Sequence, residues 1–242
     1  MRIGIIAAMP GELKPLVRGW ERQRSGVKGL AVWNTMRGED ELIAVAGGMG
    51  SHAAARSVTA AEFLGALDML ISVGWAGALE AGMKTGSCYI PSEVIDSQTG
   101  ERFLLTDGKR QLRLVTTASV VDRTEKQRLW QSYGAVLVDM EAATVARLAQ
   151  MRGIPFCCFK AVSDAPDAEL PDMNPFIDAQ GQMKMSAFLA HVAVRPVFWG
   201  SLLELGKNST TAARAIAEKV NSFLIDKDVE RLNRTGAIQA SE

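Results

Sequence analysis

Three acidic residues each follow directly on an apolar run of the sequence. Glu12 comes after IGIIAAMPG, Glu141 after VLVDM, and Asp164 after CCFKAVS. Taken alone, each of these residues is typical of an acid at a helix start, where the helix dipole stabilises a negative charge. Together, they favour a site that uses carboxylates for acid and base chemistry. We predict that the three carboxylates face a common cleft.

The apolar runs before these acids recur along the chain, with helical segments between them. We expect strands over residues 3–8, 42–46, 69–73, 112–116, 135–138 and 155–162, and helices over residues 11–20, 51–64, 124–132, 141–151 and 208–223. Such alternation predicts an α/β fold, and continuous runs such as LIAVAGG suit strands that are covered on both faces. The sequence therefore predicts a mixed, largely parallel central sheet flanked by helices, with function at the carboxyl ends of its strands.

Length and composition agree with one globular domain. The chain has 242 residues, of which 48% are apolar and 22% charged, as is ordinary for a folded domain. We place the domain at residues 1–228 and a flexible tail at residues 229–242. Gly100, Asp107 and Gly108 predict turns in a hairpin region.

Charge and cysteine usage exclude several classes of partner. Basic and acidic residues balance at 27 each, so no global field attracts nucleic acid. Cys88, Cys157 and Cys158 lack metal-ligand spacing, which indicates reduced thiols, and we expect neither a metal nor a cofactor. The apolar run at the amino terminus is too short for a signal peptide, and charges interrupt the apolar stretch over residues 183–205. We therefore expect a cytoplasmic protein without an integral membrane segment.

Five blocks of the sequence carry a family resemblance. They are IGIIAAMPGE, GGMGSHAAA, SVGWAGAL, VDMEAATVA and FKAVSDAPD, which lie within residues 2–168. In this order they resemble the methylthioadenosine/adenosylhomocysteine nucleosidases and the purine and uridine phosphorylases of the nucleoside phosphorylase superfamily. The resemblance implies a small-molecule purine nucleoside as substrate and a homodimer or larger homo-oligomer as the assembly.

The resemblance also implies a role for each acid. Breaking a purine ribosyl bond passes through a ribose cation and requires the departing base to be neutralised. By resemblance, Asp164 protonates or hydrogen-bonds the purine N7 while Ser163 holds its carboxyl, and Glu12 orients and deprotonates the attacking water. Glu141 would accept the ribose hydroxyls, with Met140 packed under the sugar. The remaining substrate-binding residues that the resemblance implies are Met9, Met49, Gly50, Trp75, Gly77 and Val120.

Several positions depart from the family pattern. Trp75 replaces a small residue and would crowd or stack on whatever enters the site, and Lys160 replaces an arginine and loses its bidentate fork. Val120 lies in a region that often supplies an aromatic residue, so the base would be held mainly by backbone contacts. Ser72 stands where phosphorylases carry a phosphate-binding arginine, which leaves Arg56 as an alternative anion ligand. Water is therefore favoured as the nucleophile, and phosphorolysis stays the alternative.

The carboxyl-terminal third departs further. Its LPDMN and RPVFW segments resemble the hopanoid-associated branch of the superfamily, whose members are implicated in removing adenine from adenosylhopane, a lipid-like substrate. An apolar helix around Phe198 and Trp199 would then line the pocket for the 5′ substituent. The alternative is a core or subunit-interface helix kinked at Pro196, and His191 on this stretch is predicted to be a packed histidine.

Two other functional classes agree less well with the sequence than an enzyme that acts on nucleosides. A dinucleotide-dependent enzyme is disfavoured because Pro10 and Glu12 stand where a Gly-x-Gly-x-x-Gly turn requires bare backbone. A non-catalytic nucleoside-binding protein, in which Trp75 closes the reaction geometry, stays open. The presence of all three acids favours the enzyme.

Overall fold

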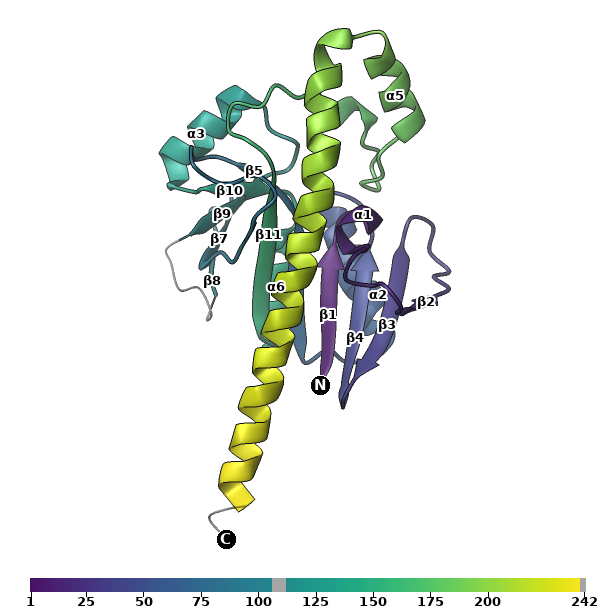
Figure 1. Cartoon of the computed structure of the whole chain (residues 1–242), viewed down its shortest axis with the longest axis vertical. Helices are drawn as coiled ribbons and strands as arrows, with labels where there is room; N and C mark the ends of the chain where they lie inside the picture. The colour runs from purple at the N-terminus through teal and green to yellow at the C-terminus, as the bar shows by residue number, and fades with distance from the viewer. Residues whose placement is uncertain (106–111, 240–242) are drawn as a thin grey trace.

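A computed structural model describes residues 1–105 and 112–239, with side chains described up to residue 227 (Figure 1). The predicted turn residues Asp107 and Gly108 lie outside the described residues, as do residues 240–242 of the predicted tail. Gly100 does lie in a turn, where its φ of +75° is of the kind that favours glycine.

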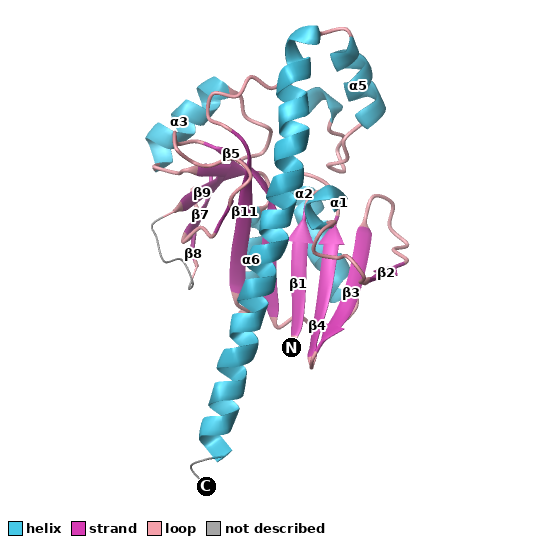
Figure 2. Cartoon of the chain, in the orientation of Figure 1, coloured by secondary structure: helices cyan, strands magenta, loops and turns pink. Residues whose placement is uncertain are grey.

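Among the described residues, eleven strands form one mixed sheet (Figure 2). They are β1 (Arg2–Ala7), β2 (Glu21–Gln23), β3 (Ala31–Arg37), β4 (Asp40–Ala46), β5 (Met69–Ala78), β6 (Cys88–Tyr89), β7 (Glu93–Asp96), β8 (Arg102–Leu104), β9 (Arg113–Thr116), β10 (Leu137–Asp139) and β11 (Phe156–Asp164). The main path runs β2-β3-β4-β1-β5-β10-β9-β7-β8, and β11 pairs with β5 and β6. β5 is parallel to β1 and β11 but antiparallel to β10, so it joins the two halves of the sheet.

Helices cover both faces of this sheet (Figure 1). The α-helices are α1 (Pro10–Leu13), α2 (Ser51–Glu62), α3 (Arg123–Tyr133), α4 (Ala142–Arg152), α5 (Met185–Ala193) and α6 (Trp199–Gln239), with 3₁₀ turns at Asn174–Phe176 and Pro196–Phe198. α1 and α6 pack on one face, α2 and α4 on the other, and α3 packs near the β9 end.

Alternation along the central strands explains the two cores. Ile5 of β1 belongs to the cluster under α1 and α6, and its neighbour Ile6 belongs to the cluster under α2 and α4. Successive residues of a strand face opposite sides, so a strand covered by helices on both faces must be apolar throughout. On α6, Ala212, Ile216 and Val220 recur every four residues and form the buried stripe. The predicted α/β architecture is therefore confirmed.

The individual elements differ from the predictions where local breaks intervene. The helix expected over residues 11–20 ends at Leu13, because Pro15 lacks a backbone N–H and disfavours helical geometry at Lys14. The predicted helix over residues 208–223 lies inside the much longer α6. β2, β3, β6, β7 and β8 were not predicted as strands, since they lack long apolar runs.

The apolar stretch near residue 190 forms a helical hairpin beside the strand ends (Figure 1). The chain bends by 110° between α5 and α6, so it breaks at Pro196 rather than kinking within one helix. No single helix in the described part of the chain has the length and hydropathy of a membrane span. Only α5 and the first part of α6, taken together as a bent pair, meet those two criteria.

Candidate active site

A cavity of about 270 Å³ lies between the carboxyl ends of the central strands and the α5–α6 hairpin. Its strand-end floor consists of Ala8, Met9, Glu12, Met49, Trp75, Ala76, Gly77, Thr117, Ser119, Val120, Val121, Lys126, Val138, Asp139, Met140, Glu141, Ser163 and Asp164. Its helical roof consists of Leu170, Met173, Met183, Met185, Phe188, Leu202, Leu205 and Ser209. All the catalytic and nucleoside-binding residues implied by the family resemblance line this cavity except Gly50.

Glu12 is held in place by backbone donors from two elements. Its Oε2 accepts a hydrogen bond from the Met9 N–H at 2.7 Å, and its Oε1 accepts one from the Trp75 N–H at 2.8 Å. The residue is only 3% exposed, and this burial raises the pKa of its carboxyl, although the N–H donors and Lys160 act in the opposite direction. A Cβ at Gly74 would lie 2.9 Å from Oε1, so glycine is required there.

Glu141 lies between β10 and α4, and its Oε1 accepts a hydrogen bond from the Gly50 N–H at 2.6 Å. Gly50 therefore acts on the site by positioning this carboxylate. Burial raises the pKa of Glu141 to about 8, with a further contribution from the negative charge of Asp139. Glu141 thus differs from an ordinary surface glutamate in holding its proton near neutral pH.

A buried ion pair lies behind Glu141. Lys160 Nζ is 2.8 Å from Asp139 Oδ2, and both side chains are shielded from solvent. Burial disfavours the ammonium, but Asp139 and Glu141 are strong enough to raise the pKa of Lys160 overall. Lys160 was expected from the sequence as a departure from the family, whereas Asp139 was not predicted, although an acid two residues before Glu141 was a visible signal.

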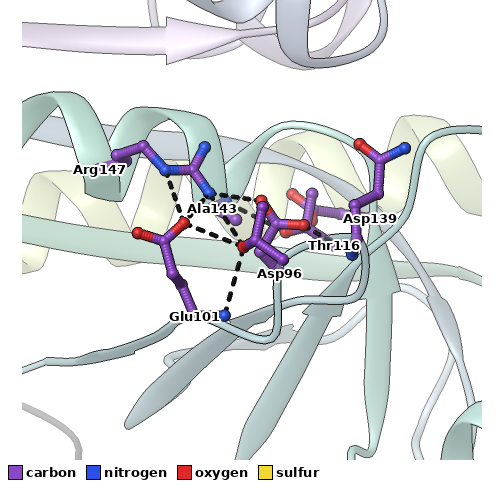
Figure 3. Close-up of polar contacts among 8 residues, drawn as sticks. Asp96, Glu101, Thr116, Asp139, Ala143 and Arg147 are labelled. Carbon is purple, nitrogen blue, oxygen red and sulfur yellow. Dashed lines mark hydrogen bonds and ion pairs between the residues drawn. The ribbon is translucent and has the colours of Figure 1, made fainter.

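Figure 3 shows how Asp139 is connected to the start of α4. The Thr116 hydroxyl donates to Asp139 Oδ1 at 2.6 Å and accepts from the Ala143 N–H at 3.1 Å. One turn further along, Arg147 forms ion pairs with Asp96 and Glu101 on the hairpin of β7 and β8. These contacts along the first half of the helix hold the residues that precede it, including Glu141.

Asp164 ends β11, and both of its carboxylate oxygens have partners. Ser163 Oγ lies 2.5 Å from Oδ1, and the Lys126 ammonium pairs with Oδ2. Lys126 Nζ also donates to the Ala165 carbonyl oxygen at 2.7 Å. Lys126 was not predicted from the sequence, where its only signal was a lysine on the buried side of a helix, one turn before Leu129.

Trp75 connects the floor to the roof. Its indole Nε1 donates to the Ser209 carbonyl of α6 at 3.1 Å, and a Cβ at Gly11 would lie 3.3 Å from its ring. Since its backbone N–H also holds Glu12, Trp75 contributes to the order of the site itself. The ring lines the cavity, where the sequence analysis expected it to crowd or stack on a ligand.

Two polar groups that the sequence analysis considered for ligands have protein partners instead. The N–H and C=O of Val120 are both bound to the Asn174 side-chain amide, each at 2.9 Å, so base contacts at this backbone require Asn174 to move. Arg56 donates to the carbonyls of Gly47 at 3.1 Å and Gln180 at 2.6 Å, and it does not line the cavity.

The helix around Phe198 and Trp199 does line the cavity, as expected, but through other residues. Neither residue lines the cavity, and Trp199 Nε1 donates instead to the Val192 carbonyl at 3.0 Å, which fastens α6 to α5. The roof is formed by Leu202 and Leu205, one and two turns further along α6. The predicted packing of His191 is confirmed by its ring contact with Phe176.

Comparisons with known proteins agree with this geometry. The family model described as the phosphorylase superfamily matches residues 2–117 and 109–193. A 5′-methylthioadenosine/S-adenosylhomocysteine nucleosidase of Glaesserella parasuis is 25% identical over 203 residues, which cover 70% of this chain and 88% of the relative.

Solved structures share the fold over almost the whole chain. The 5′-methylthioadenosine/S-adenosylhomocysteine nucleosidase of Helicobacter pylori matches with a TM-score of 0.70 at 15% identity, and the futalosine hydrolase of Helicobacter pylori with 0.71 at 15%. Each match covers 93% of this chain and 98% of the other. The nucleosidase of S. pneumoniae, with the same coverage, has a TM-score of 0.67 at 22% identity.

Proposed function

The chain belongs to the phosphorylase superfamily, and on that premise we propose that it is a purine nucleosidase, which hydrolyses the N-ribosyl bond of a purine nucleoside. The observation that carries the proposal is the convergence of Glu12, Glu141 and Asp164 on one cavity. They come from three different strand ends, and a packing role would not require three acids in an apolar pocket.

The position of each carboxylate suits a different part of a nucleoside. β1 and β11 flank β5, so Glu12 and Asp164 lie on opposite sides of the segment Trp75–Gly77. This separation supports one acid at the water and the other at the departing base, since attack and departure occur on opposite faces of the sugar. Glu141, which is held by Gly50, would accept the ribose hydroxyls over Met140.

Water is the nucleophile that the described residues support. No arginine is among the described residues that line the cavity, and Arg56 is bound to two carbonyls outside it. The nearby lysines are already paired, Lys126 with Asp164 and Lys160 with Asp139. A phosphate dianion would therefore lack the cations that phosphate sites generally use.

We further propose that the substrate is an adenine nucleoside with an apolar 5′ substituent, with adenosylhopane as the specific candidate. The support is the helical roof, where Met183, Met185, Phe188, Leu202 and Leu205 face the floor. Such side chains suit a hydrocarbon group and offer it few polar contacts. From the family resemblance we also propose a homo-oligomer in the cytoplasm.

A base-release assay tests the proposal. Methylthioadenosine, adenosylhomocysteine, adenosine, inosine and an adenosine with an apolar 5′ chain would be incubated with the protein, with and without phosphate. We expect free adenine and a reducing sugar from the 5′-substituted adenosines without phosphate. Formation of ribose 1-phosphate would identify a phosphorylase instead. Tight binding without any turnover would identify a nucleoside-binding protein.

A further inference from the structure

A buried lysine lies beside the acid that faces the base. Lys126 is only 4% exposed, although it belongs to α3, a helix with many exposed side chains. Its stem passes over Gly77, where an added Cβ would lie 3.2 Å from both Lys126 Cε and Asp164 Oδ2. The glycine therefore leaves the space that the ion pair occupies.

The donors of this ammonium are not all used. A lysine ammonium has three N–H donors, and two of them are directed at Asp164 Oδ2 and the Ala165 carbonyl oxygen. The third has no acceptor among the described residues, and Lys126 lines the cavity. One N–H is thus available to a ligand at the place where the proposed function puts the purine base.

The pairing also changes what Asp164 can do. An ionised carboxylate is an acceptor only, and the oxygens of Asp164 are already engaged by Ser163 and Lys126. In the ion pair, the transferable proton is on the lysine. We propose, resting on the function proposed above, that Lys126 is the catalytic residue that protonates the departing base, while Asp164 orients Lys126 and accepts a hydrogen bond from the base.

The proton balance of this step is complete. The bond between the base N9 and the ribose C1′ breaks, its electron pair goes to the purine ring, and the Lys126 proton goes to N7. Water forms the new bond to C1′ and gives a proton to Glu12. The products are the neutral base and the free sugar, and proton exchange with solvent returns Glu12 and Lys126 to their starting states.

The pair also selects among bases. A 6-aminopurine presents an acceptor at N7 next to a donor at its amino group, which matches an ammonium next to an ionised carboxylate. A 6-oxopurine presents two acceptors on the same edge, and its oxygen would face Asp164. The inference therefore predicts preference for 6-aminopurine nucleosides.

Substrates that differ only in the leaving group test this role. Methylthioadenosine needs a proton at its base, whereas a nitrophenyl riboside with the same 5′-methylthio group loses nitrophenolate without one. For Lys126→Met, we expect kcat/KM for methylthioadenosine to fall about 10² to 10⁴-fold, with the nitrophenyl substrate changed far less. Arg128→Met on the exposed side of α3 is the matched control and should change neither rate.

A second variant separates proton donation from charge. Lys126→Arg keeps the positive charge beside Asp164, but a guanidinium does not release its proton. We expect the same selective loss in Lys126→Arg, and this variant retains the ion pair if Lys126→Met fails to fold. Equal losses on both substrates, no loss, or full rescue by arginine would overturn the inference. Failure of the wild-type protein to release any base would overturn the proposed function instead.

Discussion

The strand-end floor and the helical roof hold their shared cavity in different ways. On the floor, each carboxylate is fixed by short polar contacts, such as the two N–H donors on Glu12 and the Gly50 donor on Glu141. The roof contributes mainly apolar side chains, and a polar link to the floor runs from Trp75 to Ser209. Fixed polar groups suit a reaction with one geometry, whereas apolar surfaces tolerate changes in ligand shape. We infer that the floor determines the reaction and the roof the 5′ substituent.

The largest effect should come from the floor. Glu12→Gln keeps the size of the side chain but cannot take a proton from water, so we expect hydrolysis to fall by about 10² to 10⁴-fold while the nucleoside still binds. Adenine release and calorimetric binding measure these two effects separately. The same exchange at Glu204, which is exposed on α6, should leave both unchanged. Nearly normal turnover in Glu12→Gln would remove Glu12 from the mechanism.

The second prediction concerns stability, since the floor holds a proton that the unfolded chain releases. The pKa of Glu141 is about 8 in the folded protein and near 4.5 without its surroundings. As pH rises from 4.5 to 8, the unfolded chain loses this proton first, so the contribution of Glu141 to the free energy of unfolding decreases.

Glu141→Gln should remove this pH dependence. One pKa unit corresponds to about 1.4 kcal/mol. Between pH 5 and 8.5, we therefore expect the free energy of unfolding of the variant to rise relative to that of the wild type by about 2 to 5 kcal/mol. Urea denaturation at both pH values measures the gain. If the two proteins instead keep a constant difference in stability, Glu141 is ionised throughout and the proton is not held on the floor.

The same contrast explains which parts of the site the sequence could predict. Glu12, Glu141 and Asp164 were found because each follows its own strand, which is a local signal. Lys126 has no such signal, because its partner Asp164 is 38 residues away and only the folded chain brings them together. The fold was predicted from continuous apolar runs, and the edge strands β2 and β8 were missed because they are only three residues long and contain polar residues.

The residues of the roof were harder to predict for a geometric reason. The sequence shows that the stretch around residue 200 is apolar, but the side of α6 that faces the cavity depends on how the chain turns at Pro196. With α5 and α6 at 110°, Leu202 and Leu205 face the floor and Trp199 does not. An angle between two helices arises from their packing and is not encoded by a local pattern.

A smaller effect is expected when the 5′ group is lengthened. Each methylene buried against the roof should gain about 0.8 kcal/mol, or roughly fourfold in kcat/KM, until the cavity is filled. Measuring kcat/KM for adenosines with 5′ alkyl groups of increasing length gives this slope. Leu205→Ala should reduce the slope without changing the rate on adenosine. A flat series in the wild type would show that the roof does not contact the substituent.

The smallest effect is expected from Trp199→Ala, and it tests whether the roof acts through its lining or through its hairpin. Trp199 is 51% exposed and lies outside the cavity, with its indole N–H bound to Val192 across the hairpin. Losing one such hydrogen bond costs about 1 kcal/mol, which should lower the melting temperature by a few degrees. The dependence of kcat/KM on 5′ chain length should stay as in the wild type, because Leu202 and Leu205 still line the cavity.

Sedimentation of the same variant examines the other interpretation of this stretch, a subunit interface. If Trp199→Ala dissociates an oligomer while the chain-length dependence is kept, the exposed side of the hairpin is an interface and the lined side is the substrate pocket. If kcat/KM of the variant instead no longer depends on 5′ chain length, the roof needs the hydrogen bond of Trp199 across the hairpin to select its substrate. Trp199 would then contribute to substrate choice together with the residues that line the roof.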